Sequence, residues 1–188
     1  MKTAYIFLAD GFEDIEALGT RDVLVRAGID TQTVSISDDP FVCSSHGVTV
    51  SVDCMLDDVP VPDSDDVLIF PGGMPGSKHL AACTALVAML RAHYAAGGTV
   101  AAICAAPGLV LGQLDSLDGH EMTCFDGFEE GFKAKGATFV RRPAVISGNI
   151  ITGRGAGHAI DFGLAIVEKM EGAAAAEDVR GRMILTCE

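Results

Sequence analysis

Short, uninterrupted runs of hydrophobic residues recur along the chain, and a glycine, a proline or an acidic residue follows most of them. The clearest runs cover residues 3–9, 67–70 and 99–103. Runs of this length without polar alternation are typical of strands buried on both faces of a sheet. Further strands are predicted at residues 31–36, 122–124, 138–140, 145–147 and 150–152.

Segments with helical periodicity separate these strands. Apolar positions three or four residues apart predict helices at 15–27, 77–95, 107–114 and 160–170. Residues 43–62 interrupt the alternation of strands and helices and are expected to form a hairpin or another excursion from the sheet. The pattern over residues 173–188 indicates no definite element. Because no repeat or linker divides the chain, we expect one α/β domain over residues 1–188, with a mostly parallel sheet covered on both faces.

The 188-residue chain carries a formal net charge of −13, which makes nucleic acid and anionic membrane surfaces poor partners. High solubility is the simpler explanation of the same charge. The sequence shows no secretory leader and no apolar run long enough to cross a bilayer. We therefore expect a cytoplasmic protein that binds neither nucleic acid nor membrane.

The chain contains six cysteines: Cys43, Cys54, Cys83, Cys104, Cys124 and Cys187. No two of them have the C-x-x-C spacing, and the five histidines show no metal-ligand spacing, so we expect no metal. In a cytoplasmic protein most of these thiols should be reduced and should act as small buried hydrophobes.

Cys104 differs from the other cysteines because it lies between a predicted strand and a predicted helix. This position is typical of a nucleophile elbow, a sharp turn that exposes a side chain at the carboxyl edge of the sheet. The turns at residues 10–16 and 72–76 are expected at the same edge. A helix N-terminus beside the sulfur would favour the thiolate. A buried structural cysteine is the alternative, and we favour the reactive thiol.

The other two turns offer candidate partners for the thiol. The backbone N–H groups of Gly73, beside Gly72, and of Ala105 could form an oxyanion hole, although Gly-Gly also suits an ordinary tight turn. Glu16 either adds favourable charge to a helix start or lies buried near the thiol, where burial would raise its pKa. The acidic first turn and the absence of G-x-G-x-x-G or Walker motifs argue against flavin or nucleotide binding.

Four motifs occur in an order that resembles the ThiJ/PfpI superfamily. They are Asp10-Gly-Phe-Glu-Asp-Ile-Glu16, Phe70-Pro-Gly-Gly73, Ala101-Ala-Ile-Cys-Ala-Ala-Pro107 and Arg154-Gly-Ala-Gly157. The resemblance spans almost the whole chain and is nearest to the DJ-1 branch of deglycases and its bacterial relatives. It implies a flavodoxin-like three-layer sandwich, of the class I glutamine amidotransferase type, a homodimer and no cofactor.

The resemblance also implies residue roles and a reaction. Cys104 matches the oxidisable nucleophile, Glu16 its hydrogen-bonded acid, and Gly73 and Ala105 the backbone donors. The implied activity is that of a glyoxalase or deglycase, which converts methylglyoxal or glyoxal, free or as adducts on glycated proteins or amino acids, to hydroxy acids. An alternative is an oxidative-stress sensor or chaperone whose thiol becomes a sulfinic acid.

A cysteine peptidase-like hydrolase is the weaker alternative, because Ala105 stands where protease-like members have histidine. Phe125 replaces a histidine of animal members, which removes support for a His-assisted step.

Several other matches leave alternatives open. Arg26 and Arg154 match family arginines near the pocket or the dimer interface. Arg154 could bind a substrate carboxylate or carbonyl, but we favour a structural salt bridge. Whether Cys124 or Cys43 acts as a resolving thiol stays open, as does the role of His46, which lies near the place of a third family arginine.

Overall fold

A seven-stranded sheet forms the centre of the computed structural model, which describes residues 2–185. Cys187 lies outside the described residues. The strand order is β10-β11-β7-β6-β1-β2-β5. The strands are β1 (Thr3–Leu8), β2 (Asp30–Ser35), β5 (Cys54–Met55), β6 (Val67–Phe70), β7 (Thr99–Ile103), β10 (Ala144–Ser147) and β11 (Ile150–Gly153). Every neighbouring pair is parallel except β10 and β11, which confirms the mostly parallel sheet.

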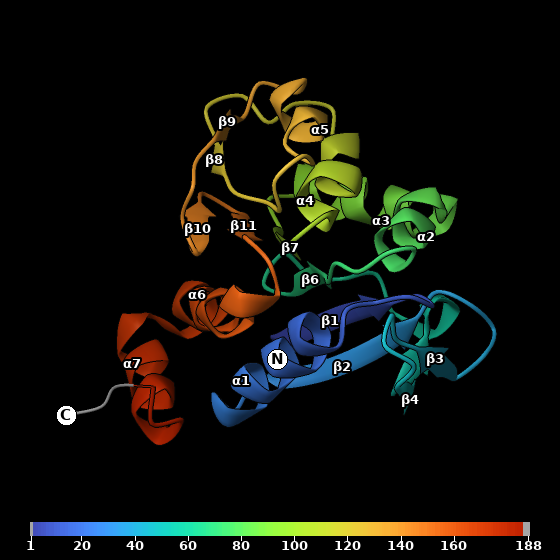
Figure 1. The fold of residues 1–188 in the computed structure, drawn as a ribbon, viewed down its shortest axis with the longest axis horizontal. Helices are drawn as coiled ribbons and strands as arrows, with labels where there is room; N and C mark the ends of the chain where they lie inside the picture. Colours follow the sequence, from blue (N-terminus) through green and yellow to red (C-terminus); the bar gives the residue numbers. More distant parts are fainter. Residues whose placement is uncertain (1, 186–188) are drawn as a thin grey trace.

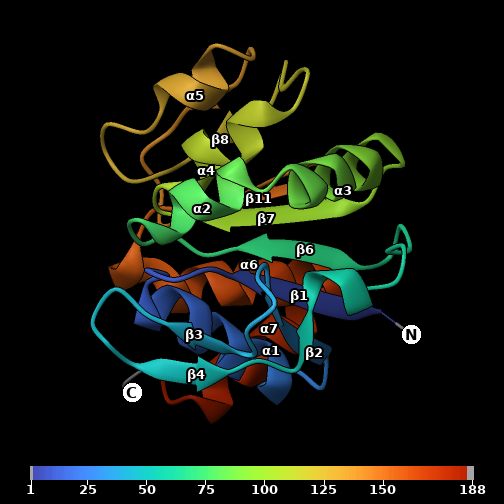
Figure 2. The same cartoon turned by 90° about the vertical axis from the view of Figure 1, so that its right-hand side faces the viewer.

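Helices cover both faces of this sheet (Figures 1 and 2). One face carries α1 (Thr20–Arg26), α6 (Ala159–Glu171) and α7 (Ala173–Arg182). The other carries α2 (Gly76–Ala82), α3 (Thr84–Ala95), α4 (Ala106–Leu109) and α5 (Glu130–Lys133). In Figure 1 the strands lie between α2, α3 and α4 on one side and α6 and α7 on the other, which is the three-layer sandwich expected from the sequence.

The two layers explain why the strands have no polar face. In β1, Ile6 and Leu8 pack in the core under α1 and α6, whereas Tyr5 and Phe7 pack in the core under α2 and α3. All six residues of β1 are buried. A strand covered on both sides needs apolar side chains at successive positions, and this produces the uninterrupted hydrophobic runs.

Four short strands lie outside the main sheet. β3 (Phe41–Cys43) and β4 (Thr49–Ser51) form an antiparallel hairpin within the predicted excursion. β8 (Glu121–Met122) and β9 (Thr138–Phe139) form a separate parallel pair. None of the helices in the described residues has the length and apolar character that a bilayer crossing requires.

Two predicted helices are shorter than the periodicity indicates. The helix predicted at 77–95 is divided at Cys83, whose backbone is extended with ψ of 100° and which joins α2 to α3. Neither glycine nor proline marks this break. The helix predicted at 107–114 ends at Leu109 and continues as a 3₁₀ turn over Leu111–Gln113. The last stretch, which predicted no definite element, forms α7 up to Arg182.

Replacing Gly163 with alanine should destabilise the protein, because the new methyl group would lie 2.9 Å from the Cβ of Val23 in α1. Val23 is β-branched and has little freedom to move away. Overpacking of this kind costs about 1–3 kcal/mol of unfolding free energy, measurable by urea denaturation. Gly181→Ala in α7 is the matched control, since no atom lies within 4 Å of a Cβ there. Equal stability of the two variants would contradict the close contact of α1 with α6.

Candidate active site

Cys104 occupies a strained turn at the carboxyl end of β7. Its φ of +65° lies in the left-handed region, which costs a residue with a Cβ about 1–2 kcal/mol. Two backbone hydrogen bonds hold the turn: Cys104 N donates to Gly153 O over 3.0 Å, and Phe125 N donates to Cys104 O over 2.8 Å. The turn leaves the Cys104 residue half-buried at the sheet edge, the geometry expected of a nucleophile elbow.

Glu16 approaches the same edge from the turn after β1. It lies in a π-helical turn, η1 (Ile15–Gly19), that precedes α1; such turns are rare and concentrate at functional sites. The Glu16 side chain is 1% exposed, and its Oε2 accepts a hydrogen bond from Gly72 N over 2.8 Å. Within residues 2–185, Oε1 is buried without a hydrogen bond of ordinary geometry. One of the two carboxyl oxygens therefore lacks a partner that would help to hold the group ionised.

Gly72 provides the space in which the two side chains meet. A Cβ at this position would collide with Glu16 Oε2 and would lie 2.5 Å from Cys104 Cβ and 3.0 Å from its Sγ. Real Cβ atoms do not approach other atoms this closely, so only glycine fits between the carboxyl and the thiol. The Gly-Gly turn after β6 is thus more than an ordinary tight turn.

The pKa values of the two groups are coupled. Burial and the Glu13 carboxylate raise the pKa of Glu16, and hydrogen bonds from the Cys104 thiol and the Gly72 backbone oppose them, so that the pKa lies at about 7. Burial and the neighbouring Glu16 raise the pKa of Cys104 to about 12, whereas hydrogen bonds from the backbone of Ala105 and Gly73 lower it. Between these values the pair holds a single negative charge, which belongs to the pair rather than to one residue.

The Ala105 backbone at the start of α4 favours the thiolate, as expected, but its effect on the Cys104 pKa is smaller than that of burial and of Glu16. α4 is only four residues long, so few aligned peptide dipoles act on the sulfur. Burial and the Glu16 charge outweigh them. The two predicted backbone donors, Gly73 and Ala105, are nevertheless at the sulfur, as the sequence indicated.

Arg154 forms a structural ion pair, as we favoured from the sequence. One guanidinium nitrogen donates to Cys124 O over 2.8 Å, and the other lies 2.7 Å from Asp126 Oδ1. The guanidinium also lies over the ring of Phe139.

Cys124 is fully buried in the core under α2 and α3, whereas Cys104 packs against the core on the opposite face. Both thiols are free, and a resolving role of Cys124 stays open.

Arg26 does not lie in the site. It ends α1, and its side chain pairs with Asp22 over 2.7 Å while its carbonyl accepts a hydrogen bond from Arg182. Since α1 starts near the carboxyl edge of the sheet and runs toward the opposite edge, Arg26 is a full helix away from Cys104. Arg26 therefore does not line the pocket of its own chain, and its match to an arginine at a dimer interface stays a prediction.

His46 joins the β3–β4 hairpin to the turn that carries Glu16. His46 Nδ1 lies 2.6 Å from Asp14 Oδ2, and Ser44 Oγ donates to Asp14 Oδ1 over 2.6 Å. The hydrogen bond to Asp14 raises the pKa of His46. Glu13, Asp14 and His46 offer ligand atoms within 4.8 Å of one another. The mutual bond of Asp14 and His46 explains this approach without a metal.

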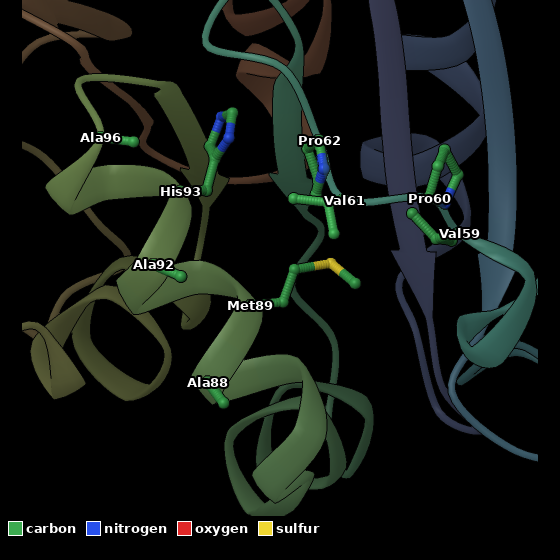
Figure 3. Close-up of a pocket in the computed structure, with 9 residues that line it drawn as sticks. All are labelled: Val59, Pro60, Val61, Pro62, Ala88, Met89, Ala92, His93 and Ala96. Atoms are coloured by element: carbon green, nitrogen blue, oxygen red, sulfur yellow. The ribbon is translucent and has the colours of Figure 1, made fainter.

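Two pockets flank the ends of the sheet. One, of about 320 Å³, lies beside the elbow and is lined by Phe125, Asp126 and residues 154–158. The other, of about 340 Å³, lies between α3 and residues 59–62, near the ends of β6 and β7 away from Cys104. Figure 3 shows Met89 extending from α3 toward Val61 in this second pocket. Its lining is apolar apart from His93, whose Nε2 lies 3.2 Å from Thr99 O.

The order of motifs, the fold and the site all agree with a comparison to known families. The sequence profile of the DJ-1/PfpI family matches residues 2–169. The chain belongs to the DJ-1/PfpI family.

Relatives from plants and animals match most of this DJ-1/PfpI chain. Protein DJ-1 homolog A from Arabidopsis thaliana is 34% identical over 184 residues, which cover 98% of this chain and 47% of the plant protein. The chain thus spans about half the length of that relative. Glutathione-independent glyoxalase DJR-1.2 from Caenorhabditis elegans is 34% identical over 172 residues, 91% of this chain and 90% of the relative.

Crystal structures of DJ-1 proteins share the fold closely. Drosophila melanogaster DJ-1beta superposes with a TM-score of 0.89 at 31% identity, covering 100% of this chain and 99% of that one. Oxidized Toxoplasma gondii DJ-1 superposes with a TM-score of 0.88 at 31% identity, covering 98% of both chains. The sandwich expected from the sequence is therefore the fold of DJ-1/PfpI proteins.

Sequence reasoning missed two features of this DJ-1/PfpI site. The first is the network of Asp14, Ser44 and His46, for which the acidic turn was the only signal. The second is the anchoring of the elbow by the backbone of Gly153 and Phe125. Backbone hydrogen bonds between distant segments leave no side-chain pattern, so the sequence carried no signal for them.

Replacing Glu16 with glutamine should alter how stability depends on pH. The folded-state pKa of Glu16, about 7, lies above its ordinary value of 4.5, so the folded protein holds this proton more tightly than the unfolded chain. The resulting stabilisation is fully present below the ordinary pKa and is lost as pH rises through the folded pKa. It amounts to at most about 3 kcal/mol.

Urea denaturation of wild type and Glu16→Gln from about pH 5 to about pH 8 measures this effect. The stability of wild type relative to the variant should fall across this range. A constant difference between the two proteins would contradict the raised pKa of Glu16.

Proposed function

We propose that the chain is a cofactor-independent glyoxalase that converts methylglyoxal or glyoxal to a 2-hydroxy acid. The observation that carries this proposal is the meeting of a strained, half-buried Cys104 with the buried carboxyl of Glu16 and two backbone donors. A nucleophile, an acid–base group and an oxyanion site then lie at one sheet edge. The same chemistry on early glycation adducts would appear as deglycase activity.

The first step is attack of the thiol on the aldehyde carbon. Glu16, with a pKa of about 7, is partly ionised at neutral pH and takes the thiol proton. The shared negative charge then resides on sulfur, where the N–H groups of Gly73 and Ala105 stabilise it. As the C–S bond forms, the charge moves to the aldehyde oxygen, which becomes the hydroxyl of a hemithioacetal by taking the proton back.

The second step moves hydrogen between the two carbons of the substrate. The Glu16 carboxylate removes the proton from the former aldehyde carbon while the ketone oxygen gains a proton, which gives an enediol. The same carboxyl returns the proton to the neighbouring carbon as the hydroxyl on the first carbon loses its proton, which yields a thioester and an alcohol. The first carbon is oxidised and the second reduced, so no external oxidant is needed. Water then cleaves the C–S bond, and the products are the free thiol and lactate, or glycolate from glyoxal.

A relative's name supports this proposal. The Caenorhabditis elegans protein that shares 34% identity with this chain is named a glutathione-independent glyoxalase. In the site described here a cysteine of the protein itself supplies the sulfur that glutathione would otherwise provide. The expected homodimer and cytoplasmic location stay predictions.

Replacing Cys104 with serine should abolish lactate formation from methylglyoxal, because the alcohol is a far weaker nucleophile than the thiol. Glu16→Gln should lower kcat/KM by about 10²–10⁴-fold, the usual contribution of a positioned acid–base group. Cys83→Ser, at another half-buried thiol, is the control and should keep full activity. Retention of full turnover by Cys104→Ser and Glu16→Gln would show that this mechanism is wrong.

A redox sensor with chaperone activity is the second candidate function. The solved structure from Toxoplasma gondii with 31% identity is that of an oxidized DJ-1. In this chain a Cys104 sulfinate would be held by the backbone donors and by a protonated Glu16. A peptidase-like role has less support, since among residues 2–185 no histidine contributes to the pKa shift of the thiol.

Mild peroxide should oxidise Cys104 before the other thiols if this second function holds. Intact-mass and peptide mass spectrometry would show a gain of two oxygen atoms at Cys104, and Glu16→Gln should reduce the sulfinate yield. Suppression of client-protein aggregation, measured before and after oxidation, tests the chaperone activity. Oxidation confined to other cysteines would rule out the sensor.

A further inference from the structure

The pocket beside the elbow, lined by Phe125, Asp126 and residues 154–158, is here called the Phe125 pocket. Both of its walls are tied to the nucleophile. Phe125 N donates to Cys104 O over 2.8 Å, and Cys104 N donates to Gly153 O, next to Arg154, over 3.0 Å. The pocket therefore has a fixed position relative to the thiol, although neither the proposed acid nor the backbone donors line it.

Phe125 is an aromatic residue that the fold leaves uncovered. Its side chain is 53% exposed, and its ring meets Phe128 edge to face with centroids 6.5 Å apart. Across the pocket, a Cβ at Gly155 would lie 3.5 Å from the Phe125 ring. Phe128 and Gly155 thus limit the movement of the ring while one part of it stays open. Covering this surface with an apolar group would remove it from water.

The opposite wall is almost bare backbone. Residues 155–157 carry only one methyl group between them, that of Ala156. A Cβ at Gly157 would meet no atom within 4 Å, so the space next to it is open. The pocket volume of about 320 Å³ lies in the range that holds small organic ligands and exceeds what the methyl group of methylglyoxal needs.

The charged groups around the pocket are already paired. Arg154 binds Cys124 O and Asp126, and Arg141 also lies 3.1 Å from Asp126 Oδ1. His158 Nδ1 lies 3.1 Å from Asp161 Oδ2. An anionic or cationic substrate group would have to break one of these pairs to be recognised. The Phe125 pocket therefore suits a neutral, planar apolar group.

We propose that the Phe125 pocket binds the aryl substituent of aromatic 2-oxoaldehydes while Cys104 attacks their aldehyde carbon. This proposal rests on the proposed glyoxalase function and names its substrate class. For phenylglyoxal the net reaction adds one water: the aldehyde carbon becomes a carboxylate, the ketone carbon becomes a secondary alcohol, and one proton is released. The product is mandelate.

Steady-state kinetics with phenylglyoxal and methylglyoxal test the proposal. Phe125→Ala removes the aromatic wall, and Gly157→Leu fills the open space without a backbone clash. Each should lower kcat/KM for phenylglyoxal relative to methylglyoxal by about tenfold or more. Ala92→Leu, an exposed small-to-large change in the distant pocket of Figure 3, is the matched control and should leave both values unchanged.

Alkylation of Cys104 provides a readout that does not require turnover. Phenacyl bromide and bromoacetone carry the same reactive carbon with an aryl or a methyl ketone; the Cys104 sulfur forms a bond to that carbon, and bromide leaves. Rates are followed by mass spectrometry and divided by the rates with glutathione. The wild type should favour phenacyl bromide, and Phe125→Ala and Gly157→Leu should lose this preference.

The two assays separate the failure of each proposal. One result is that neither oxoaldehyde is turned over, while alkylation of Cys104 shows an aryl preference that the two variants lose. This result would reject the glyoxalase function and support the proposed role of the Phe125 pocket. The opposite result is turnover of methylglyoxal with two ratios that are the same in wild type and variants: the kcat/KM ratio of phenylglyoxal to methylglyoxal, and the alkylation-rate ratio of phenacyl bromide to bromoacetone. This result would overturn the proposed role of the Phe125 pocket and support the glyoxalase function. Melting temperatures of all variants show whether any loss comes from unfolding.

Discussion

Two acidic groups held side by side away from water impose the constraint on which the site depends. Burial opposes the charge on either group, and each charge opposes the other. Between about pH 7 and about pH 12 the pair of Glu16 and Cys104 therefore holds one proton, which can reside on the carboxyl or on the thiol. Gly72 makes this arrangement possible because any side chain there would separate the two groups. The proposed reactivity therefore depends on whether the negative charge resides on Glu16 or on Cys104, and not on a lowered pKa of the thiol.

The parallel sheet brings these groups together from distant parts of the chain. β1, β6 and β7 are neighbours, so the turns that follow them meet at one edge. The strain at Cys104 is tolerated because the strand before it and the backbone hydrogen bonds on both sides of it leave no relaxed alternative. A rigid, doubly covered sheet is thus the support that keeps a strained residue in place.

The sequence was sufficient for features that depend on local pattern. Buried strands leave continuous apolar runs, and the turns after them contained Glu16, Gly73 and Cys104. The direction of the Cys104 pKa shift was not predictable, because it depends on burial and on a carboxyl that is distant in sequence. The break at Cys83 had no glycine or proline to mark it. The place of Arg26 depended on the direction of α1, which a motif match does not contain.

The seven residues that line the Phe125 pocket belong to neither hydrophobic core. Four of them lie in loops and Ala156–His158 form a short 3₁₀ helix, whereas Cys104 and Glu16 are held at the edge of the sheet. Loops outside a core tolerate substitution with little loss of stability. Under the proposed function, substitutions at residues 155–157 change which substituents the site accepts while Cys104 and Glu16 stay unchanged. Arg154 and Asp126 are the exception among the pocket residues, because their ion pair also supports the fold.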